Sequence, residues 1–242
     1  MRWDTHYSLS YVIVNSKEIP DLSSRIKMRF GLIEAVARNL RKPSGTFIGK
    51  AVKIFLVKKC AMLEREAARL CDIQPDYQVL EVGFGPGLGI EAASKYIKDG
   101  EGKVYGVDFS EEMVTIATKL VGEDISKGKV ELIHGDVADL SFFESNKFDR
   151  VFHCNCYYFW PDLDTAVREL HRVMKTDALM VTTMNLERSL RMKELGLFRY
   201  GNIDQRRYTD ALKACGFNDV SVEKTKHKDS GKIYDAICAR KV

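Results

Sequence analysis

The sequence predicts an α/β protein with a seven-stranded, mostly parallel sheet, an antiparallel last strand and a helical N-terminal layer. An apolar run at residues 79–82 ends in closely spaced glycines, and a helical pattern follows at 90–97. This is the pattern of a strand, a tight turn and a helix. Short β-rich segments and helical patterns then alternate, which is typical of a parallel sheet. Two final β-rich runs, 220–223 and 233–239, predict an antiparallel pair.

The elements between the glycines and the C-terminus follow from the same patterns. Runs of β-forming residues predict strands, and amphipathic runs between them predict helices. Ser110 stands where it can cap the helix that begins beside it, and Gly216 is placed to end the last helix. The predicted strands are 103–108, 130–134, 148–154 and 178–183; one helix starts at 110, and the others span 164–174, 186–200 (a helical insertion) and 204–215.

The N-terminal part predicts helices in front of this sheet. Residues 21–24 resemble a helix start, and apolar residues at helical spacing follow until a break at 43–45. A second amphipathic helix is predicted for residues 47–70. Residues 7–14 have a strand-like composition and fit an edge strand or a loose arm.

Composition and charge describe an ordinary globular chain. Of 242 residues, 45% are apolar and 30% are charged, enough for a substantial core. This length suits one ligand-binding domain, residues 73–242, with an N-terminal helical extension, residues 1–72. The net charge of +4 falls short of a dedicated nucleic-acid binder. Residues 1–75 carry 14 Lys and Arg against 7 Asp and Glu. This excess of positive charge fits either solvated helix faces or a surface that binds an acidic partner.

The cysteines and the apolar runs bear on metals, compartment and membranes. The six cysteines show no C-x-x-C spacing, so neither a zinc site nor a disulfide framework is predicted. Free thiols fit a reducing compartment. No leader pattern opens the sequence, and the longest apolar run, near residue 55, is broken by lysines and too short for a membrane span. We therefore expect a cytoplasmic protein without a membrane-spanning segment.

The glycine-rich turn is the first candidate for ligand binding. Gly83, Gly85 and Gly87 lack side chains, so a ligand can lie against the backbone, and the following helix offers free N–H groups to an anion. A P-loop is excluded because no Gly-Lys-Ser/Thr follows. The dinucleotide pattern G-x-G-x-x-G fails at Leu88 when started at Gly83, and fits only in its alanine-ended form when started at Gly87. A nicotinamide-dependent (NAD(P)) oxidoreductase therefore stays open as an alternative.

The same stretch resembles motif I of the class I S-adenosylmethionine-dependent methyltransferases, in which an acid precedes G-x-G-x-G. Glu81 with Gly83, Gly85 and Gly87 supplies that pattern. The resemblance implies a Rossmann-like fold and S-adenosyl-L-methionine as cofactor. It also implies that the methionine carboxylate meets the helix N-terminus and that the ammonium group needs a nearby acid such as Glu81. N-terminal helices in this family often cover the active-site cleft, although packing on the sheet edge explains them equally well.

Two further strand ends carry acids at the edge where ligands bind in such sheets. Asp108 ends the second strand, where a carboxylate can accept from both ribose hydroxyls, and the adjacent Phe109 can lie against adenine. Any ribose-bearing cofactor would use Asp108, so it does not separate the candidates. In methyltransferases an acid at the third strand end commonly accepts from the adenine amino group, a role that falls to Asp136 with Val137 beside it. A cap on the following turn is the alternative explanation of Asp136.

Residues 148–162 fill the place of methyltransferase motif IV. By that resemblance Asn155 meets the methionine end of the cofactor, while Tyr157, Tyr158 and Trp160 wall the methyl-transfer cavity and bind substrate. Core packing is the alternative for any one of these rings. The run Trp-Pro-Asp that begins at Trp160 resembles the tail of this motif in small-molecule methyltransferases.

These motifs predict methyl transfer to an O, N or C atom of a small-molecule acceptor. Methyltransferases that act on base amino groups carry Asn/Asp-Pro-Pro-aromatic here, and this chain lacks both prolines, so no nucleic-acid partner is expected. Cys154 and Cys156 leave a thiophilic substrate such as trivalent arsenic as a minor alternative. A general base is needed only if the acceptor loses a proton early; His153, Tyr157 and Tyr158 are candidates, and none is assigned.

The resemblance covers residues 43–240 and is strongest from Val79 to Asp162. It departs at residues 176–178, Thr-Asp-Ala, where the family usually has Pro-Gly-Gly in a turn remote from the cofactor. A catalytically silent S-adenosylmethionine-binding module that serves as a partner platform also fits these motifs. The motifs specify neither the acceptor nor the oligomeric state.

Overall fold

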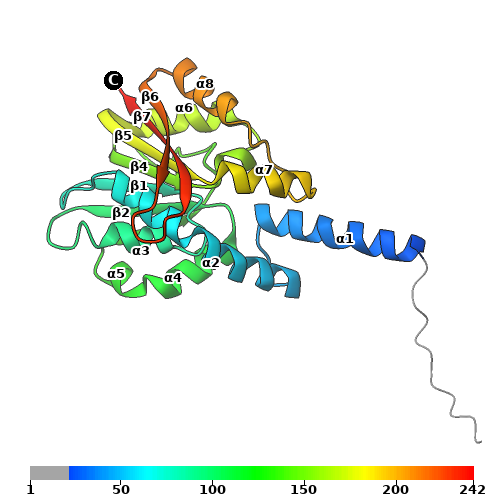
Figure 1. The fold of residues 1–242 in the computed structure, drawn as a ribbon. Coiled ribbons are helices and arrows are strands. Elements are labelled where there is room, and N and C mark those ends of the chain that lie inside the picture. The colour runs from blue at the N-terminus through cyan, green and yellow to red at the C-terminus, as the bar shows by residue number, and fades with distance from the viewer. Residues whose placement is uncertain (1–21) are drawn as a thin grey trace, which may run out of the picture.

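A computed structural model describes residues 22–242, with side chains described from Arg29 onward. Its centre is a seven-stranded sheet in the order β3-β2-β1-β4-β5-β7-β6 (Figure 1). Strands β1 to β5 pair in parallel, and β7 runs antiparallel to both β5 and β6. The predicted mostly parallel sheet with an antiparallel last strand is therefore confirmed. The strands are β1 Gln78–Val82, β2 Lys103–Asp108, β3 Val130–His134, β4 Phe148–Cys154, β5 Met174–Met184, β6 Phe217–Lys226 and β7 Ile233–Lys241.

Helices cover both faces of the sheet. On one face α6 and α8 pack on strand residues such as Leu80, and on the other face α2, α3 and α4 pack on residues such as Val79. Because successive strand residues point to opposite faces, Glu81 lies on the same side as Val79, toward α2 and α3. The helices are α1 Leu22–Arg41, α2 Phe47–Leu70, α3 Leu88–Ser94, α4 Glu111–Leu120, α5 Gly122–Ser126, α6 Leu163–Val173, α7 Leu186–Glu194 and α8 Gln205–Ala214, with a 3-10 turn, η1, at Tyr157–Phe159.

Two expectations, one about the N-terminal residues and one about membrane-spanning segments, can be compared with the structure only over the residues that it describes. The strand or arm predicted at residues 7–14 lies outside them. Within the part of the chain that the structure describes, no helix combines the length and the apolar character needed to cross a membrane.

The order of the strands reverses direction at β1, and this positions a ligand site. β1 pairs with β2 on one side and with β4 on the other. At such a switch point the carboxyl ends of the strands border a crevice. Gly83 follows β1, Asp108 ends β2 and Asn155 follows β4, and all three line one pocket.

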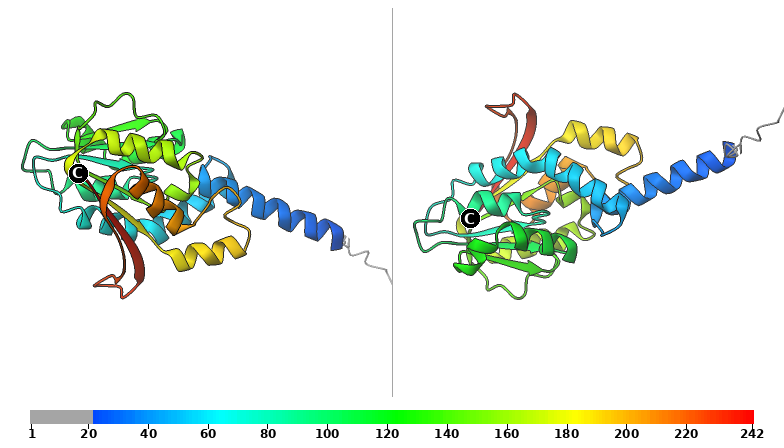
Figure 2. Two further views of the ribbon diagram at one scale, coloured as in Figure 1. Left: turned by 90° about the horizontal axis from the view of Figure 1, so that it is seen from above. Right: turned by 90° about the horizontal axis from the view of Figure 1, so that it is seen from below.

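The two N-terminal helices are placed differently. α1 extends away from the body of the molecule, whereas α2 lies along it (Figure 1 and Figure 2). α2 contacts α3 and the strands β4 and β5. Its N-terminus is capped by Thr46, whose Oγ1 accepts from the Gly49 N–H at 3.1 Å. Because α2 is part of the cover of the sheet, a domain boundary after residue 72 stays a prediction.

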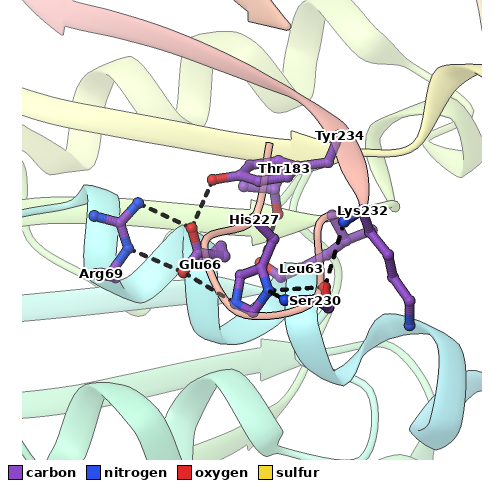
Figure 3. Close-up of polar contacts among 8 residues, drawn as sticks. All are labelled: Leu63, Glu66, Arg69, Thr183, His227, Ser230, Lys232 and Tyr234. Atoms are coloured by element: carbon purple, nitrogen blue, oxygen red, sulfur yellow. Dashed lines mark hydrogen bonds and ion pairs between the residues drawn. The ribbon is translucent and has the colours of Figure 1, made fainter. Parts of the chain in front are cut away.

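A polar cluster between α2 and the last strands fixes how α2 is rotated about its axis (Figure 3). Glu66 of α2 accepts a hydrogen bond from the Tyr234 hydroxyl at 2.6 Å and two from the Arg69 guanidinium at 2.9 Å. His227, after β6, lies 3.9 Å from the same carboxylate. The Thr183 hydroxyl of β5 donates to a backbone carbonyl of α2 at 2.9 Å. These contacts determine which side chains of α2 face the ligand crevice.

Some local features differ from the sequence predictions. Ser110 stands at the N-cap of α4, but its hydroxyl does not cap the helix and lies 3.4 Å from the Pro43 carbonyl. Asp108 Oδ1 instead accepts from the Ser110 N–H at 2.9 Å. β5 begins earlier than predicted, because an irregular register lets Met174 pair with Phe148. The short elements α5 and η1 have no counterpart in the sequence predictions.

Candidate functional site

A pocket opens at the carboxyl ends of β1, β2 and β4. It holds about 920 Å³ of space between the atoms, part of which is open solvent. The glycine turn, the ends of β2, β3 and β4, and residues of α1 and α2 form its wall. The predicted site residues that line it are Gly83, Gly85, Asp108, Phe109, Asp136, Val137, Asn155 and Trp160, and those that do not are Glu81, Gly87, Tyr157 and Tyr158.

The glycine turn approaches the pocket with its backbone alone. Gly83, Gly85 and Gly87 all have a positive φ, which glycine adopts without strain. A Cβ at Gly85 would meet no atom within 4 Å, so this position faces open space at the pocket. A Cβ at Gly87 would instead lie 2.8 Å from Ala117 Cβ of α4. Gly85 therefore leaves room for a ligand, whereas Gly87 allows α3 and α4 to pack closely.

Asp108 ties the glycine turn to the end of β2. Its Oδ2 accepts from the Gly85 N–H and its Oδ1 from the Ser110 N–H, each at 2.9 Å. Burial raises the pKa of this carboxyl to about 6, although both N–H groups favour its charged form. Each oxygen keeps a second lone pair, so the carboxylate can also accept from a ligand. Phe109 lines the pocket beside it, with the Lys42 ammonium 5.4 Å from its ring centre.

The end of β3 contributes Asp136 and Val137 to the pocket wall. Asp136 Oδ1 accepts from the Ala138 N–H at 3.0 Å, so the alternative explanation of this acid, a cap on the following turn, is present in the structure. This bond uses one carboxylate oxygen, and the exposed side chain keeps the other for a ligand. The two roles of Asp136 therefore do not exclude each other.

Asn155 lies at the end of β4 with a left-handed backbone, at φ 49°. Its Nδ2 donates to Cys154 Sγ at 3.2 Å and to Cys60 Sγ of α2 at 3.6 Å. Its Oδ1 is buried and has no hydrogen-bond partner among the described residues. Cys60, Cys154 and Cys156 line the pocket, where burial raises the pKa of Cys60 to about 11 and those of the other two well above the usual value. These thiols are therefore protonated at neutral pH.

The aromatic residues after β4 divide between the pocket and the core. Trp160 lines the pocket as predicted, and so does Phe159, which the prediction omitted. Tyr157 and Tyr158 are buried in the core, where Tyr157 stacks on Tyr208 with ring centres 4.3 Å apart. The 3-10 turn η1 begins at Tyr157 and buries both rings. The expected place of these two tyrosines on the cavity wall is corrected to core packing.

His153 is a core residue and not a general base. It is fully buried, and burial lowers its pKa to about 3. Its Nε2 lies 2.7 Å from the Tyr208 hydroxyl and 2.8 Å from the Thr182 hydroxyl, and its Nδ1 lies 3.4 Å from Cys156 Sγ. A neutral imidazole with both nitrogens engaged, away from the pocket wall, does not take a proton from a pocket ligand.

Two buried acids stand at the site where the motif predicted one. Glu81 of β1 is 1% exposed, and neither carboxylate oxygen has a hydrogen-bond partner among the described residues. Glu64 of α2 is 6% exposed, lines the pocket and has an equally unpartnered Oε2. The N–H groups of Gly89 and Ile90 lower the pKa values of Glu64 and Glu81, respectively, but less than burial raises them. Both acids therefore lie beside the first N–H groups of α3.

Five of the pocket residues that the sequence analysis missed come from the N-terminal helices. Leu56, Cys60 and Glu64 line the pocket from one face of α2, at the i, i+4, i+8 spacing of a helix. Leu40 and Arg41 line it from the end of α1. The sequence signal for Glu64 is that it shares one helical face with Leu56 and Cys60, so that an acid lies among less polar residues. These helices therefore border the cleft as well as packing on the sheet.

Comparison with known proteins identifies the domain that forms this pocket. Residues 80–182 match the methyltransferase domain family. This part of the chain is similar to methyltransferase domains. The matched span holds every motif residue from Glu81 to Trp160, whereas α2 with Glu64 lies before it. The family resemblance of the sequence is confirmed.

Curated relatives share the methyltransferase domain over part of their length. A demethylmenaquinone methyltransferase of Bacillus cereus (strain B4264) is 35% identical over 111 residues, which are 46% of this chain and 46% of that protein. An uncharacterized methyltransferase of Bacillus subtilis, YdaC, is 28% identical over 145 residues, 60% of this chain and 74% of that protein. The chain thus spans about half the length of the demethylmenaquinone methyltransferases that it matches.

Solved structures share the methyltransferase fold at low sequence identity. An S-adenosylmethionine-dependent methyltransferase from Aquifex aeolicus superposes with a TM-score of 0.59 at 20% identity, covering 76% of this chain and 93% of that one. A geranyl diphosphate methyltransferase in complex with S-adenosylmethionine gives a TM-score of 0.62 at 17% identity, covering 82% and 92%. The Rossmann-like class I fold is confirmed.

Proposed function

We propose that the protein transfers the methyl group of S-adenosyl-L-methionine to an O, N or C atom of a small-molecule acceptor. The observation that carries this proposal is the hydrogen bond that ties the open glycine position, Gly85, to Asp108 at 2.9 Å. It brings bare backbone and a carboxylate together at one pocket, which is what an adenosyl ligand requires. The match of residues 80–182 to methyltransferase domains favours this cofactor over a nicotinamide dinucleotide.

The pocket residues fit the adenosine part of this cofactor and one acceptor position at its methionine end. Asp108 would accept from the ribose hydroxyls, and Phe109 and Val137 would flank the adenine. Asp136 would accept from the adenine amino group. Asn155 would meet the methionine end, where its unpartnered Oδ1 is available as an acceptor. When bound, the cofactor supplies a methyl group that is already activated on a sulfonium.

The residues of this chain contribute positioning rather than proton transfer. Phe159 and Trp160 line the pocket together with Asn155 and give it an apolar wall. His153 and both tyrosine candidates are buried in the core, and the pocket thiols are protonated. Aligning the acceptor with the methyl and the sulfur is therefore the main catalytic contribution. We propose an acceptor atom that needs no early removal of a proton.

The pocket wall supports an acceptor with an apolar portion. Leu40, Leu56, Phe159 and Trp160 all contribute apolar side chains to it. One relative is named for demethylmenaquinone and one structural neighbour for geranyl diphosphate, and these names agree with such an acceptor. A cytoplasmic location and the absence of a nucleic-acid partner are part of the proposal, supported by six free cysteines and the modest net charge.

Binding and turnover measurements test the proposal. Calorimetry should show binding of S-adenosylmethionine and no binding of NADH; binding of NADH instead would favour the oxidoreductase alternative. Tritium-labelled donor incubated with a metabolite extract should yield labelled products, which identify the acceptor. Cofactor binding without label transfer to any acceptor would favour the catalytically silent module.

A further inference from the structure

Among the described residues, no cation forms a close ion pair with the buried acids Glu64 and Glu81. Arg65 lowers the pKa of Glu64, but its side chain is 58% exposed and lies 4.0 Å from Glu91. Burial raises the pKa of Glu64 to about 8. Burial, followed by repulsion from Glu64 and Asp108, raises the pKa of Glu81 well above its usual value. These raised pKa values keep both acids protonated at neutral pH in the ligand-free protein.

Unpartnered buried oxygens of this kind point to a ligand. Buried polar atoms in folded proteins are nearly always hydrogen-bonded, and a buried carboxylate without a partner costs stability. Glu64 Oε2 and both oxygens of Glu81 lack partners among the described residues, and Glu64 borders the pocket. A ligand that supplies hydrogen-bond donors and positive charge would satisfy Glu64 Oε2 and favour the ionised form of Glu64.

The charge and the donors together narrow the chemistry of that ligand. Among residues 22–242, no group of three His, Cys, Asp or Glu side chains is arranged to hold a metal ion. An organic cation fits better. A primary ammonium carries three N–H donors for the unpartnered oxygens, whereas a sulfonium carries charge but no donor.

We propose that Glu64 of α2 binds the ammonium group of the methyl donor, so that α2 completes the cofactor site. This inference rests on the proposed function. Glu64 precedes the matched span 80–182, and it is therefore a contribution of the N-terminal helix of this chain rather than of the methyltransferase motifs. Glu64 lines the pocket, and its buried Oε2, which has no partner among the described residues, is available to an N–H donor of a ligand.

The variant Glu64→Gln keeps the shape of the side chain but cannot ionise when a cationic ligand binds. Calorimetry at neutral pH compares it with the wild type for three ligands: S-adenosylmethionine, S-adenosylhomocysteine and methylthioadenosine. The second keeps the ammonium without the sulfonium charge, and the third lacks the whole amino-acid end. We expect the affinity for the first two to fall by about tenfold or more, the scale of one charged hydrogen bond. The affinity for methylthioadenosine should not change.

Glu66→Gln is the matched control, because Glu66 lies on the same helix but contacts Tyr234 and Arg69 (Figure 3). It should leave all three affinities unchanged. Equal losses in both variants, or an equal loss for all three ligands in Glu64→Gln, would overturn the inference, since the placement of α2 would then be responsible. A wild type that binds no donor refutes the proposed function itself. Normal donor binding by Glu64→Gln refutes only the role of Glu64.

Thermal unfolding separates a ligand contact from a structural role. A residue that only supports the fold lowers the unfolding temperature when it is replaced. Removing an unpaired buried acid should instead maintain or raise the unfolding temperature of the ligand-free protein, while the increase caused by added S-adenosylmethionine becomes smaller. A Glu64→Gln protein that is less stable without ligand and keeps the full ligand-induced increase would contradict the inference.

Discussion

Replacing Asp108 with Asn tests the connection between the glycine turn and the cofactor. The wild-type carboxylate accepts from the N–H groups of Gly85 and Ser110, each at 2.9 Å. Asn has one carbonyl oxygen, so its amide NH2 must face one of these two donors. One charged hydrogen bond is lost and one buried donor is left unpaired, together about 2–4 kcal/mol. For a chain of this length, that lowers the melting temperature by roughly 5–15 °C.

The same substitution should weaken S-adenosylmethionine binding by about ten- to a hundredfold in calorimetry, because the charged acceptor for the ribose hydroxyls is lost. Asp149→Asn is the control. Asp149 also accepts a backbone N–H, from Gln78 at 2.8 Å, and pairs with Lys175 at 2.7 Å, but it stands at the start of β4, away from the pocket. This control should lower the melting temperature and leave affinity unchanged. A folded Asp108→Asn protein with wild-type affinity would refute the assignment.

Four further outcomes follow from the structure. Donor affinity measured by calorimetry should fall as pH is lowered through about 6, since the raised pKa of Asp108 means that its carboxyl is then protonated. The ligand-free protein should lose stability as pH rises from about 5 to about 8, because folded Glu64 retains a proton that the unfolded chain releases; urea unfolding of Glu64→Gln should give a flatter profile. Gly85→Val should abolish donor binding, whereas Gly128→Val, with a similarly positive φ and open surroundings but outside the pocket, should only reduce stability. Tyr208→Phe removes the hydroxyl bonded to His153 and should lower the unfolding free energy by about 1 kcal/mol, with methyl transfer to an identified acceptor unchanged.

The elements that the sequence predicted best are those whose pattern is set locally. The bounds of β2, β3 and β4 agree with the prediction, because each is a short β-rich run between turn residues. The start of β5 could not be predicted in this way. It depends on the pairing of Met174 with Phe148 across an irregular register, and Asp177 adopts a φ of 63° within it. Such pairing is a property of the assembled sheet and not of either segment.

The residues of the candidate site show the same difference between features that local sequence sets and features that tertiary packing sets. Asp108 and Asn155 could be placed at the pocket because strand ends at a switch point converge whatever the side chains around them. Tyr157 could not be placed, because the direction of its ring is set by stacking on Tyr208, which is distant in sequence. Gly87 fits the motif, yet its lack of a side chain serves packing against Ala117. A motif therefore identifies the turn, while tertiary packing decides which of its residues reach the ligand.

The rotation of α2 about its axis decides both which of its residues meets the polar cluster of the last strands and which of its acids lines the pocket. Glu64 and Glu66 are two residues apart, which separates their directions by about 200° around a helix. When the Tyr234 hydroxyl and Arg69 hold Glu66 on one side, Glu64 is directed to the opposite side, where it lines the pocket. A one-residue change in the spacing of these two acids would turn one of them away from its partners. The position of an acid in the pocket wall thus depends on helix geometry outside the methyltransferase motifs, and sequence comparison confined to those motifs does not reveal it.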